Sequence, residues 1–270
     1  MEETRIYDVN DEKLHIYSKL SEVELRRHYE PEPGIFICES PKVIRRALEA
    51  GYEPISVLTS ITEPDCDAAF VFENTKGVPC YFGDEKVLKN LTGYNLTGGL
   101  LCAMRRKELT DVKTLLKGRT KVAVLEDVEN PTNMGAIFRS AAAMGVETVV
   151  LTSDCVDPLY RRSARVSMGN VFLIPWTRIN CKTGYTSLLK ELGFAVVSMA
   201  LSDASVSISD KRIKEEDKIA VILGNEGNGL KEETIKDSDY VSKIPMKEGV
   251  DSLNVAAASA VAFWEIFGKK

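Results

Sequence analysis

Short apolar runs alternate with amphipathic stretches along the second half of the chain. This alternation is typical of βαβ units, which build a parallel sheet covered by helices on both faces. The expected strands span residues 122–125, 148–151, 171–175, 195–199, 219–223 and 241–244. The expected helices span residues 133–144, 159–168, 183–192, 231–235 and 252–267. Ligands of such sheets bind beyond the carboxyl ends of the strands, so the segments found there are the candidates for chemistry.

The first half of the chain predicts a smaller mixed α/β unit. Its expected strands span residues 34–38, 55–59, 68–72, 79–82 and 99–104, and its expected helices span 42–50 and 84–91. Ser40-Pro41 resembles a helix start, and Gly51 resembles a helix end. The composition changes near the charged run at residues 105–107, without a Gly/Ser linker. We therefore expect two closely coupled domains, residues 1–115 and residues 116–270.

Composition narrows the function classes. The chain is 44% hydrophobic and 28% charged, with no apolar run long enough to cross a membrane and an acidic N-terminus unlike a secretory signal. Its six scattered cysteines predict free thiols in a reducing cytoplasm and argue against a zinc site. The only histidines are His15 and His28, so chemistry in the second half would run without a histidine base. A net charge of −5 argues mildly against nucleic-acid binding by bulk charge, although it does not exclude a local basic patch.

The first candidate segment spans residues 129–141 and contains Asn133, Gly135 and Arg139. Asn133 is expected to cap the helix that follows, and Gly145 is expected to end it. An arginine in this apolar, small-residue stretch either extends to solvent, is paired, or faces an anion.

The second candidate segment, residues 221–230, runs from a buried strand into a turn with the spacing G-x-x-G-x-G. This spacing differs from the dinucleotide fingerprint and from the Walker loop. A plain tight turn would explain the glycines. Glu226 within the turn is harder to explain in that way, because a carboxylate at the mouth of a site holds cations, hydroxyls or an arginine.

The third candidate segment, residues 244–260, leads from a strand into the last helix. That helix is apolar almost all round, which predicts that it is buried. Ser252 or Asp251 is expected to cap it. Asn254 needs a hydrogen-bond partner if the start of the helix is buried, although capping alone would explain both Ser252 and Asn254.

Taken together and in this order, the three segments resemble the motifs of the SpoU (TrmH) family of RNA ribose methyltransferases, within the SPOUT class. The resemblance covers roughly residues 120–268. The matching residues are Asn133, Gly135 and Arg139; Gly224, Glu226, Gly227 and Gly229; Ile244-Pro245-Met246; and Ser252-Leu253-Asn254-Val255-Ala256. Arg165, Ser167 and Gly169 also match the arginine-x-serine-x-glycine stretch of the family.

The first half is similar, more loosely, to the substrate-binding domain of L30e type that is often fused to this catalytic domain. Residues 34–48 carry most of this likeness. The family has a glycine after a glutamate in this stretch, and Ser40 stands in its place after Glu39.

The resemblance implies an α/β fold with a C-terminal trefoil knot that forms a pocket for S-adenosylmethionine (AdoMet). Residues implied to hold AdoMet are Met199, Leu223, Gly224, Gly227, Ile244, Met246, Ser252 and Leu253. The implied reaction is methyl transfer to a ribose 2′-hydroxyl without a metal. Residues implied to act in it are Asn133, Arg139, Glu226, Ser252 and Asn254.

The resemblance also implies a cytoplasmic homodimer that binds RNA and no membrane. Candidate RNA contacts are Lys42, Arg45, Arg46, Arg161, Arg162 and Arg165, and a solvated charged surface is the alternative explanation for each of them. The two-domain layout favours ribosomal RNA. The alternatives are the same reaction on transfer RNA, methylation of a base, and a non-catalytic RNA-binding or ribosome-assembly protein on the same fold.

Overall fold

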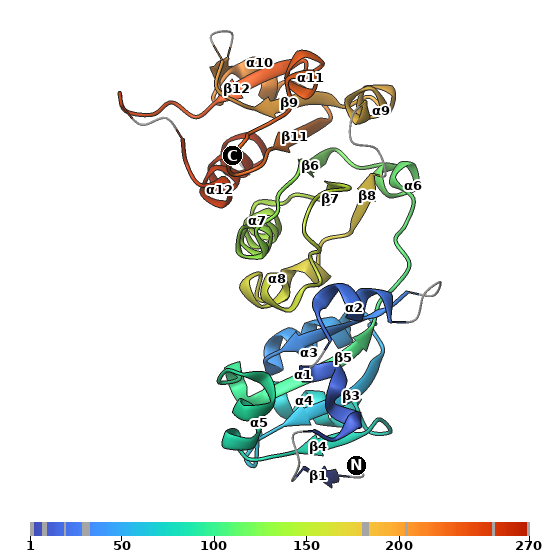
Figure 1. Cartoon of the computed structure of the whole chain (residues 1–270). Helices are drawn as coiled ribbons and strands as arrows, with labels where there is room; N and C mark the ends of the chain where they lie inside the picture. The colour runs from blue at the N-terminus through green and yellow to red at the C-terminus, as the bar shows by residue number, and fades with distance from the viewer. Residues whose placement is uncertain are drawn as a thin grey trace. The chain divides into compact units, whose positions relative to one another are not determined.

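The computed structural model describes residues 3–6, 10–18, 20–28, 33–179, 184–202, 205–249 and 252–268. Its packing divides the chain into two compact units (Figure 1). Unit 1 comprises Met1–Glu108 and Pro158–Leu173, and unit 2 comprises Leu109–Asp157 and Ile174–Lys270. The segment Pro158–Leu173, which the sequence assigned to the second domain, therefore packs with the first unit.

Unit 1 is built on a mixed sheet of five strands in the order β1-β4-β3-β5-β2. The strands are β1 (Glu3–Arg5), β2 (Ile35–Glu39), β3 (Pro54–Thr59), β4 (Cys80–Phe82) and β5 (Leu100–Arg105). β1, β4 and β3 run parallel, whereas β5 pairs antiparallel with both β3 and β2.

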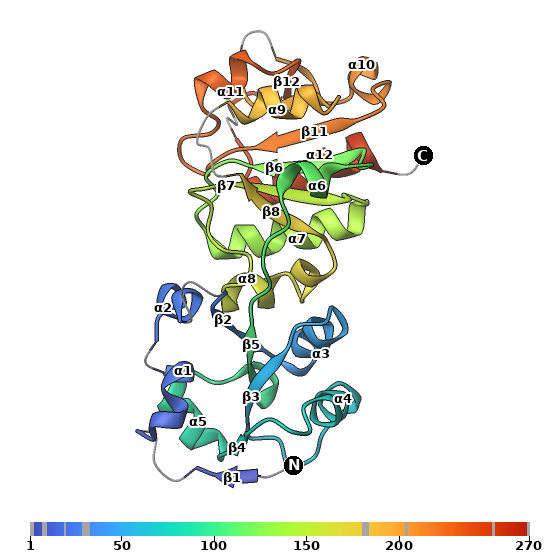
Figure 2. The ribbon, with the colours of Figure 1, turned by 90° about the vertical axis from the view of Figure 1, so that its right-hand side faces the viewer.

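Helices cover both faces of this sheet. They are α1 (His15–Ser18), α2 (Glu22–Arg27), α3 (Pro41–Glu49), α4 (Cys66–Asn74), α5 (Glu85–Thr92) and α8 (Arg161–Val166), with 3₁₀ turns η1 (Glu12–Leu14), η2 (Thr97–Gly99) and η3 (Asn170–Phe172). Figure 2 shows α1 and α5 on one side of the sheet and α3 and α4 on the other. The core between the sheet, α1 and α5 includes Leu14, Tyr17, Leu58, Leu88 and Leu101.

Unit 2 is built on a sheet of seven strands in the order β10-β12-β9-β11-β6-β7-β8. The strands are β6 (Lys121–Leu125), β7 (Thr148–Thr152), β8 (Trp176–Ile179), β9 (Ala195–Met199), β10 (Val206–Ser207), β11 (Ile219–Leu223) and β12 (Tyr240–Lys243). Every neighbouring pair is parallel. This confirms the parallel α/β fold, and the trefoil knot stays a prediction.

The helices of unit 2 lie on both faces of its sheet. They are α6 (Val112–Leu116), α7 (Pro131–Met144), α9 (Tyr185–Glu191), α10 (Lys211–Lys214), α11 (Glu232–Lys236) and α12 (Val255–Phe267). In Figure 1, α7 and α12 lie on one side of the strands, and α6 and α9 lie on the other. Strand residues such as Val122, Val124 and Ala220 are fully buried, as continuous apolar runs in a covered parallel sheet should be.

Two expected strands are wrong. Residues 68–72 lie in helix α4, whose N-cap Asp65 accepts a hydrogen bond from the backbone N–H of Ala68. Residues 171–175 contain the end of η3 and an irregular stretch, and the strand β8 begins only after Pro175. The apolar run before Pro175 therefore belongs to η3 and to the turn that follows it, and not to the edge strand β8.

Two expected helix caps are also wrong. Asn130 caps α7, accepting from the backbone N–H groups of Thr132 and Asn133, so Asn133 is the third residue of the helix. Asn254 caps α12, accepting from the backbone N–H of Ala256, and Ser252 precedes the cap. Asp251 lies outside the described residues. Gly145 ends α7 with φ +78°, as expected.

Helix α12 is only partly buried, contrary to expectation. Phe263 and Phe267 face the core, whereas Val261 and Trp264 are 40% and 62% exposed. In the described part of the chain, no helix is both long and apolar enough to cross a membrane.

Ser40 sits in a backbone conformation that favours glycine. Its φ is +83°, and its side chain makes no capping hydrogen bond to α3. A non-glycine residue held in such a region costs on the order of 1–3 kcal/mol.

We predict that Ser40→Gly raises the free energy of unfolding by about 1 kcal/mol, because relief of the strain exceeds the added entropy of the unfolded chain. The measurement is urea unfolding followed by circular dichroism, since both tryptophans, Trp176 and Trp264, lie in unit 2. The matched control is Ser40→Ala, which keeps the Cβ and should give no stabilisation. Equal stabilities of Ser40→Gly and Ser40→Ala would contradict the argument.

Candidate functional site

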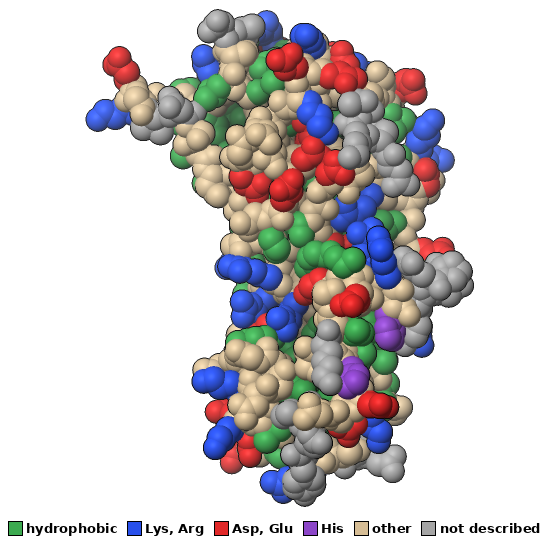
Figure 3. All heavy atoms as spheres, viewed as in Figure 1, with side chains coloured by type: hydrophobic (Ala, Val, Ile, Leu, Met, Phe, Trp, Pro, Cys, Tyr) green, Lys and Arg blue, Asp and Glu red, His purple; other side chains and the backbone are tan. Residues whose placement is uncertain are grey.

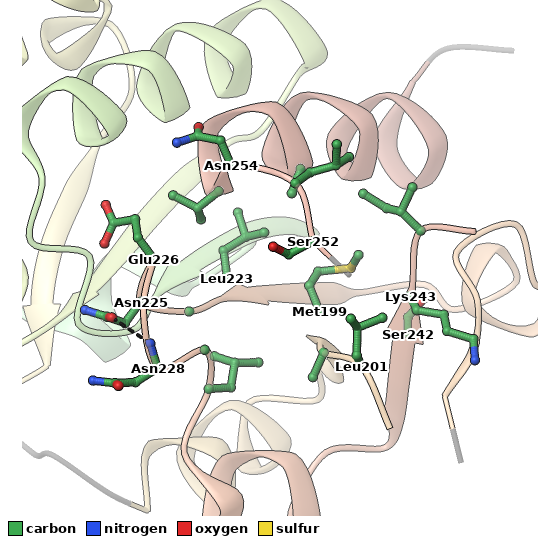
Figure 4. A pocket seen from close by; sticks show the side chains of 18 of the residues that line it. Met199, Leu201, Leu223, Asn225, Glu226, Asn228, Ser242, Lys243, Ser252 and Asn254 are labelled. Atoms are coloured by element: carbon green, nitrogen blue, oxygen red, sulfur yellow. Dashed lines mark hydrogen bonds between the residues drawn. The ribbon is translucent and has the colours of Figure 1, made fainter. Parts of the chain in front are cut away.

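A cavity of about 510 Å³ lies in unit 2, where the carboxyl ends of β9, β11 and β12 meet. Its volume is within the range of small-molecule sites. Figure 4 shows Glu226 and Asn254 at one end, Lys243 at the other, and Met199 and Ser252 between them. All eight residues implied to hold AdoMet line this cavity: Met199, Leu223, Gly224, Gly227, Ile244, Met246, Ser252 and Leu253.

A chain of hydrogen bonds joins three of the polar residues implied to act in the reaction. The Nδ2 of Asn254 donates to Oδ1 of Asn133 at 3.2 Å, and the Nδ2 of Asn133 donates to Oε1 of Glu226 at 2.7 Å. Asn133 is 9% exposed, whereas Glu226 and Asn254 are exposed. The buried amide therefore fixes one carboxylate oxygen of Glu226 and leaves the side chain accessible from solvent.

Arg139 lies apart from this chain of hydrogen bonds. It is exposed on α7 and does not line the cavity. Among the described residues, no carboxylate or carbonyl pairs with its guanidinium. The sequence left three possibilities for Arg139: that it extends to solvent, is paired, or faces an anion. Among the described residues it has no partner, and it is exposed, so its N–H donors are available to an anion.

The glycine-rich turn after β11 is closed by its own backbone and by Asn225. The backbone N–H groups of Asn225 and Gly229 each donate to the carbonyl of the other residue. The Oδ1 of Asn225 accepts from the N–H groups of Gly227 and Asn228. A Cβ on Gly224 would lie 2.5 Å from the carbonyl carbon of Gly229, so glycine is required for this close return of the chain.

A buried carboxylate anchors the end of this turn. Glu126 follows β6 and is fully buried. It accepts hydrogen bonds from Tyr185 Oη and Thr234 Oγ1, both at 2.6 Å, and from the backbone N–H of Lys231 at 2.7 Å. Burial and the hydrogen bond to Glu126 raise the pKa of Tyr185 well above its usual value, so the phenol stays a donor.

The neighbouring Asp127 holds the same turn from its other end. Its carbonyl accepts from Nδ2 of Asn225 at 2.8 Å, and its Oδ2 lies 2.7 Å from Nζ of Lys231. Asn225, at the start of the turn, and Lys231, after it, are thus both tied to Asp127 at the end of β6. Sequence reasoning missed Asn225, Glu126 and Asp127, although their place at strand ends was a signal.

The candidate RNA-binding side chains all lie in unit 1 and fall into two groups. Four are engaged within the chain: Arg45, Arg46, Arg161 and Arg165. Lys42 and Arg162 are exposed, and neither makes a hydrogen bond or ion pair with any residue that the structure describes.

Comparisons with known proteins define the class. A model of the SpoU rRNA methylase family matches residues 120–264. An uncharacterised tRNA/rRNA methyltransferase of Mycobacterium bovis is 34% identical over 270 residues, covering 96% of this chain and 90% of the relative. The chain belongs to the SpoU rRNA methylase family.

Two further proteins extend the likeness. A 23S rRNA (guanosine(2553)-2′-O)-methyltransferase of Bacillus subtilis is 28% identical over 194 residues, covering 71% of this chain and 74% of that protein. The crystal structure of an AdoMet-bound rRNA methyltransferase from Sinorhizobium meliloti has a TM-score of 0.78 and 24% identity, covering 98% of this chain and 97% of the other. At 24% identity, this structural similarity shows a shared fold and nothing further.

We predict that Tyr185→Phe lowers the free energy of unfolding by about 1.5–3 kcal/mol, because it removes a buried hydrogen bond to a carboxylate. The matched control is Tyr240→Phe, whose hydroxyl donates at the same 2.6 Å to the exposed Glu216. This control should change stability by less than about 0.5 kcal/mol. Tryptophan fluorescence during urea unfolding reports both, and equal effects would show that Glu126 does not anchor the unit.

Proposed function

We propose that this chain transfers a methyl group from AdoMet to a ribose 2′-hydroxyl of RNA, with ribosomal RNA favoured over transfer RNA. The observation that carries the proposal is the hydrogen-bonded chain from Asn254 through Asn133 to Glu226 at the mouth of the cavity. The name of the Bacillus subtilis relative supports the ribose 2′-oxygen and ribosomal RNA. The name of the Mycobacterium bovis relative includes both kinds of RNA, so transfer RNA is the alternative.

The cavity combines an apolar wall with several polar side chains, which suits a ligand that carries both a flat ring and charged or hydrogen-bonding groups. Its lining includes the side chains of Met199, Leu201, Leu223 and Leu253, and the backbone of the glycine-rich turn. The glycines of this turn, Gly224, Gly227 and Gly229, add no side chains to the wall. We therefore assign AdoMet to this cavity, where it would supply an electrophilic methyl group on a sulfonium.

The residues at the mouth of the cavity would orient the nucleophile. A ribose hydroxyl must lose its proton as it attacks, so a fixed acceptor near its oxygen is useful. Asn133 holds Oε1 of Glu226, and Oε2 makes no hydrogen bond with a described residue. Glu226 would accept a hydrogen bond from the hydroxyl or hold a nearby cation, and Ser252 and Asn254 would orient the ribose.

Arg139 would stabilise the charge that develops during attack. A guanidinium keeps its proton at any physiological pH, which argues against a role as a free base. Its paired N–H donors suit a phosphate and a developing alkoxide, in the manner of an oxyanion hole. Because Arg139 is exposed and outside the cavity lining, we propose that it completes a site in a homodimer.

We predict that Arg139→Lys lowers methyl transfer about tenfold or more, the equivalent of one lost charge-assisted hydrogen bond. AdoMet binding should be unchanged, because Arg139 does not line the cavity. The assay supplies labelled AdoMet with unmodified ribosomal or transfer RNA, followed by digestion to nucleosides. A 2′-O-methylnucleoside supports the proposal, and a base-methylated nucleoside contradicts it.

The control for this assay is Arg212→Lys, which changes an exposed arginine paired with Asp210 and should leave transfer unchanged. Normal turnover by Arg139→Lys would show that bidentate guanidinium geometry is not needed. AdoMet binding without transfer would indicate that the RNA supplied is the wrong one or that the substrate is an assembly-stage RNA, whereas neither binding nor transfer would favour the non-catalytic alternative.

The exposed face of α12 supports the homodimer. Ala257, Val261 and Trp264 recur at spacings that share one helix face, and Trp264 is 62% exposed. Contiguous apolar surface of this kind marks a protein interface.

We predict that Trp264→Glu converts a dimer into a 29.9 kDa monomer, because a charge cannot be buried unpaired at an interface. Sedimentation equilibrium measures the mass. The control is Leu173→Glu, which changes an apolar residue that is 55% exposed outside α12. A monomeric unsubstituted protein, or dissociation by both variants alike, would remove α12 as the interface.

A further inference from the structure

A buried carboxylate at the end of β2 gathers two arginines on the surface of unit 1. Glu39 is 2% exposed in its side chain and accepts from the backbone N–H of Thr97 at 2.9 Å. The same oxygen accepts from Nη1 of Arg165 at 3.3 Å, and the other oxygen lies 3.9 Å from Nε of Arg161. We call this cluster, with Tyr94, the Glu39 corner.

Tyr94 holds the guanidinium of Arg161 in place. The guanidinium carbon lies 4.5 Å from the centre of the Tyr94 ring. The hydroxyl of Tyr94 is buried and has no hydrogen-bond partner among the described residues. Burial raises the pKa of Tyr94 to about 12, so the ring is neutral at physiological pH. A planar guanidinium that stacks on a fixed ring loses less side-chain entropy when it binds an anion.

The charges at this corner do not balance. Glu39 is shared by two arginines, each about one-third exposed or more, and Glu22 accepts from the backbone N–H of Arg161. Lys42, in the first turn of α3, and Arg162, in the first turn of α8, are exposed and make no ion pair with a described residue. Four cations therefore stand against two carboxylates.

The next turn of α3 is different. Arg45 pairs with Glu49 at 2.8 Å and with Asp67 at 3.1 Å, so two carboxylates face one cation. Arg46 donates from Nη1 to the carbonyl of Met168 and to Oδ1 of Asn170, both inside the unit. The charge of Arg45 is therefore compensated by carboxylates, and Arg46 is held by neutral acceptors within the unit.

We propose that the Glu39 corner is the surface through which unit 1 binds the phosphate backbone of RNA. Arg161 and Arg165 would donate to a phosphate with the N–H groups that Glu39 leaves available. Lys42 and Arg162 would neutralise the phosphates on either side. Figure 3 shows Lys and Arg side chains gathered over the region of α8 and α3. The inference rests on the proposed function, because it takes RNA as the substrate.

The test measures how RNA affinity depends on salt. The full-length protein is titrated into a fluorescein-labelled oligouridylate at several KCl concentrations, and anisotropy reports binding. Each lost phosphate contact to single-stranded RNA should reduce the slope of log K against log salt by about 0.7, or about fivefold in affinity at 0.1 M salt. We expect this reduction for Lys42→Gln and for Arg162→Gln.

Two variants serve as controls. Arg45→Gln removes the same charge from the same helix as Lys42→Gln and should leave the slope unchanged, because its cation is already compensated. Arg162→Lys keeps the charge and should keep the slope of the unsubstituted protein, which a merely misfolded corner would not do.

Unchanged slopes for Lys42→Gln and Arg162→Gln would overturn the proposal, as would an equal effect of Arg45→Gln or no binding by the unsubstituted protein. Methyl transfer measured on the same proteins separates this inference from the proposed function. Reduced slopes without any methyl transfer would support RNA binding at the Glu39 corner and contradict the proposed methyltransferase activity. Methyl transfer with unchanged slopes would support the activity and contradict RNA binding at the corner.

Discussion

The glycine-rich turn after β11 depends on a carboxylate that is buried next to it. An unpaired carboxylate at full burial costs several kcal/mol, so Glu126 is tolerated only while its donors are present. Those donors come from α9, from α11 and from the backbone before α11. The end of the glycine-rich turn is therefore fixed by the packing of unit 2, and Asp127 adds a second tie to Asn225. The turn has few side chains of its own, and its rigidity comes from these neighbours.

The sequence predicted the second sheet well because parallel, covered strands are continuous apolar runs. The same criterion failed for residues 68–72, since a buried segment of helix is also a short apolar run. The helix signal was Asp65, whose side chain satisfies the first turn of α4. The strand predicted at residues 171–175 was wrong for a related reason. The apolar run there contains the end of η3, whose N-cap Gly169 has φ +78°, and β8 begins only after Pro175.

The sequence predicted which residues meet at the candidate site, but it did not predict the hydrogen bonds between them. Parallel strands end at one edge, so the motif residues that follow them were expected to meet. The bond between Asn133 and Glu226 joins residues 93 positions apart, which no local pattern specifies. Asn225 was overlooked because asparagine in a glycine-rich turn is explained by the turn alone. The cap was misassigned because Asn130 and Asn133 both suit that role, and only Pro131 distinguishes them.

A protein with a net negative charge can bind RNA when its carboxylates pair mainly with cationic side chains that do not contact the RNA. Screening confines electrostatic effects to roughly 8 Å at physiological salt, so the net charge of −5 matters less than the local balance. In unit 1, Glu49 and Asp67 neutralise Arg45, whereas Glu39 orients two arginines without cancelling both. With RNA bound at the Glu39 corner as proposed, the net negative charge of the chain would disfavour other approaches of the RNA.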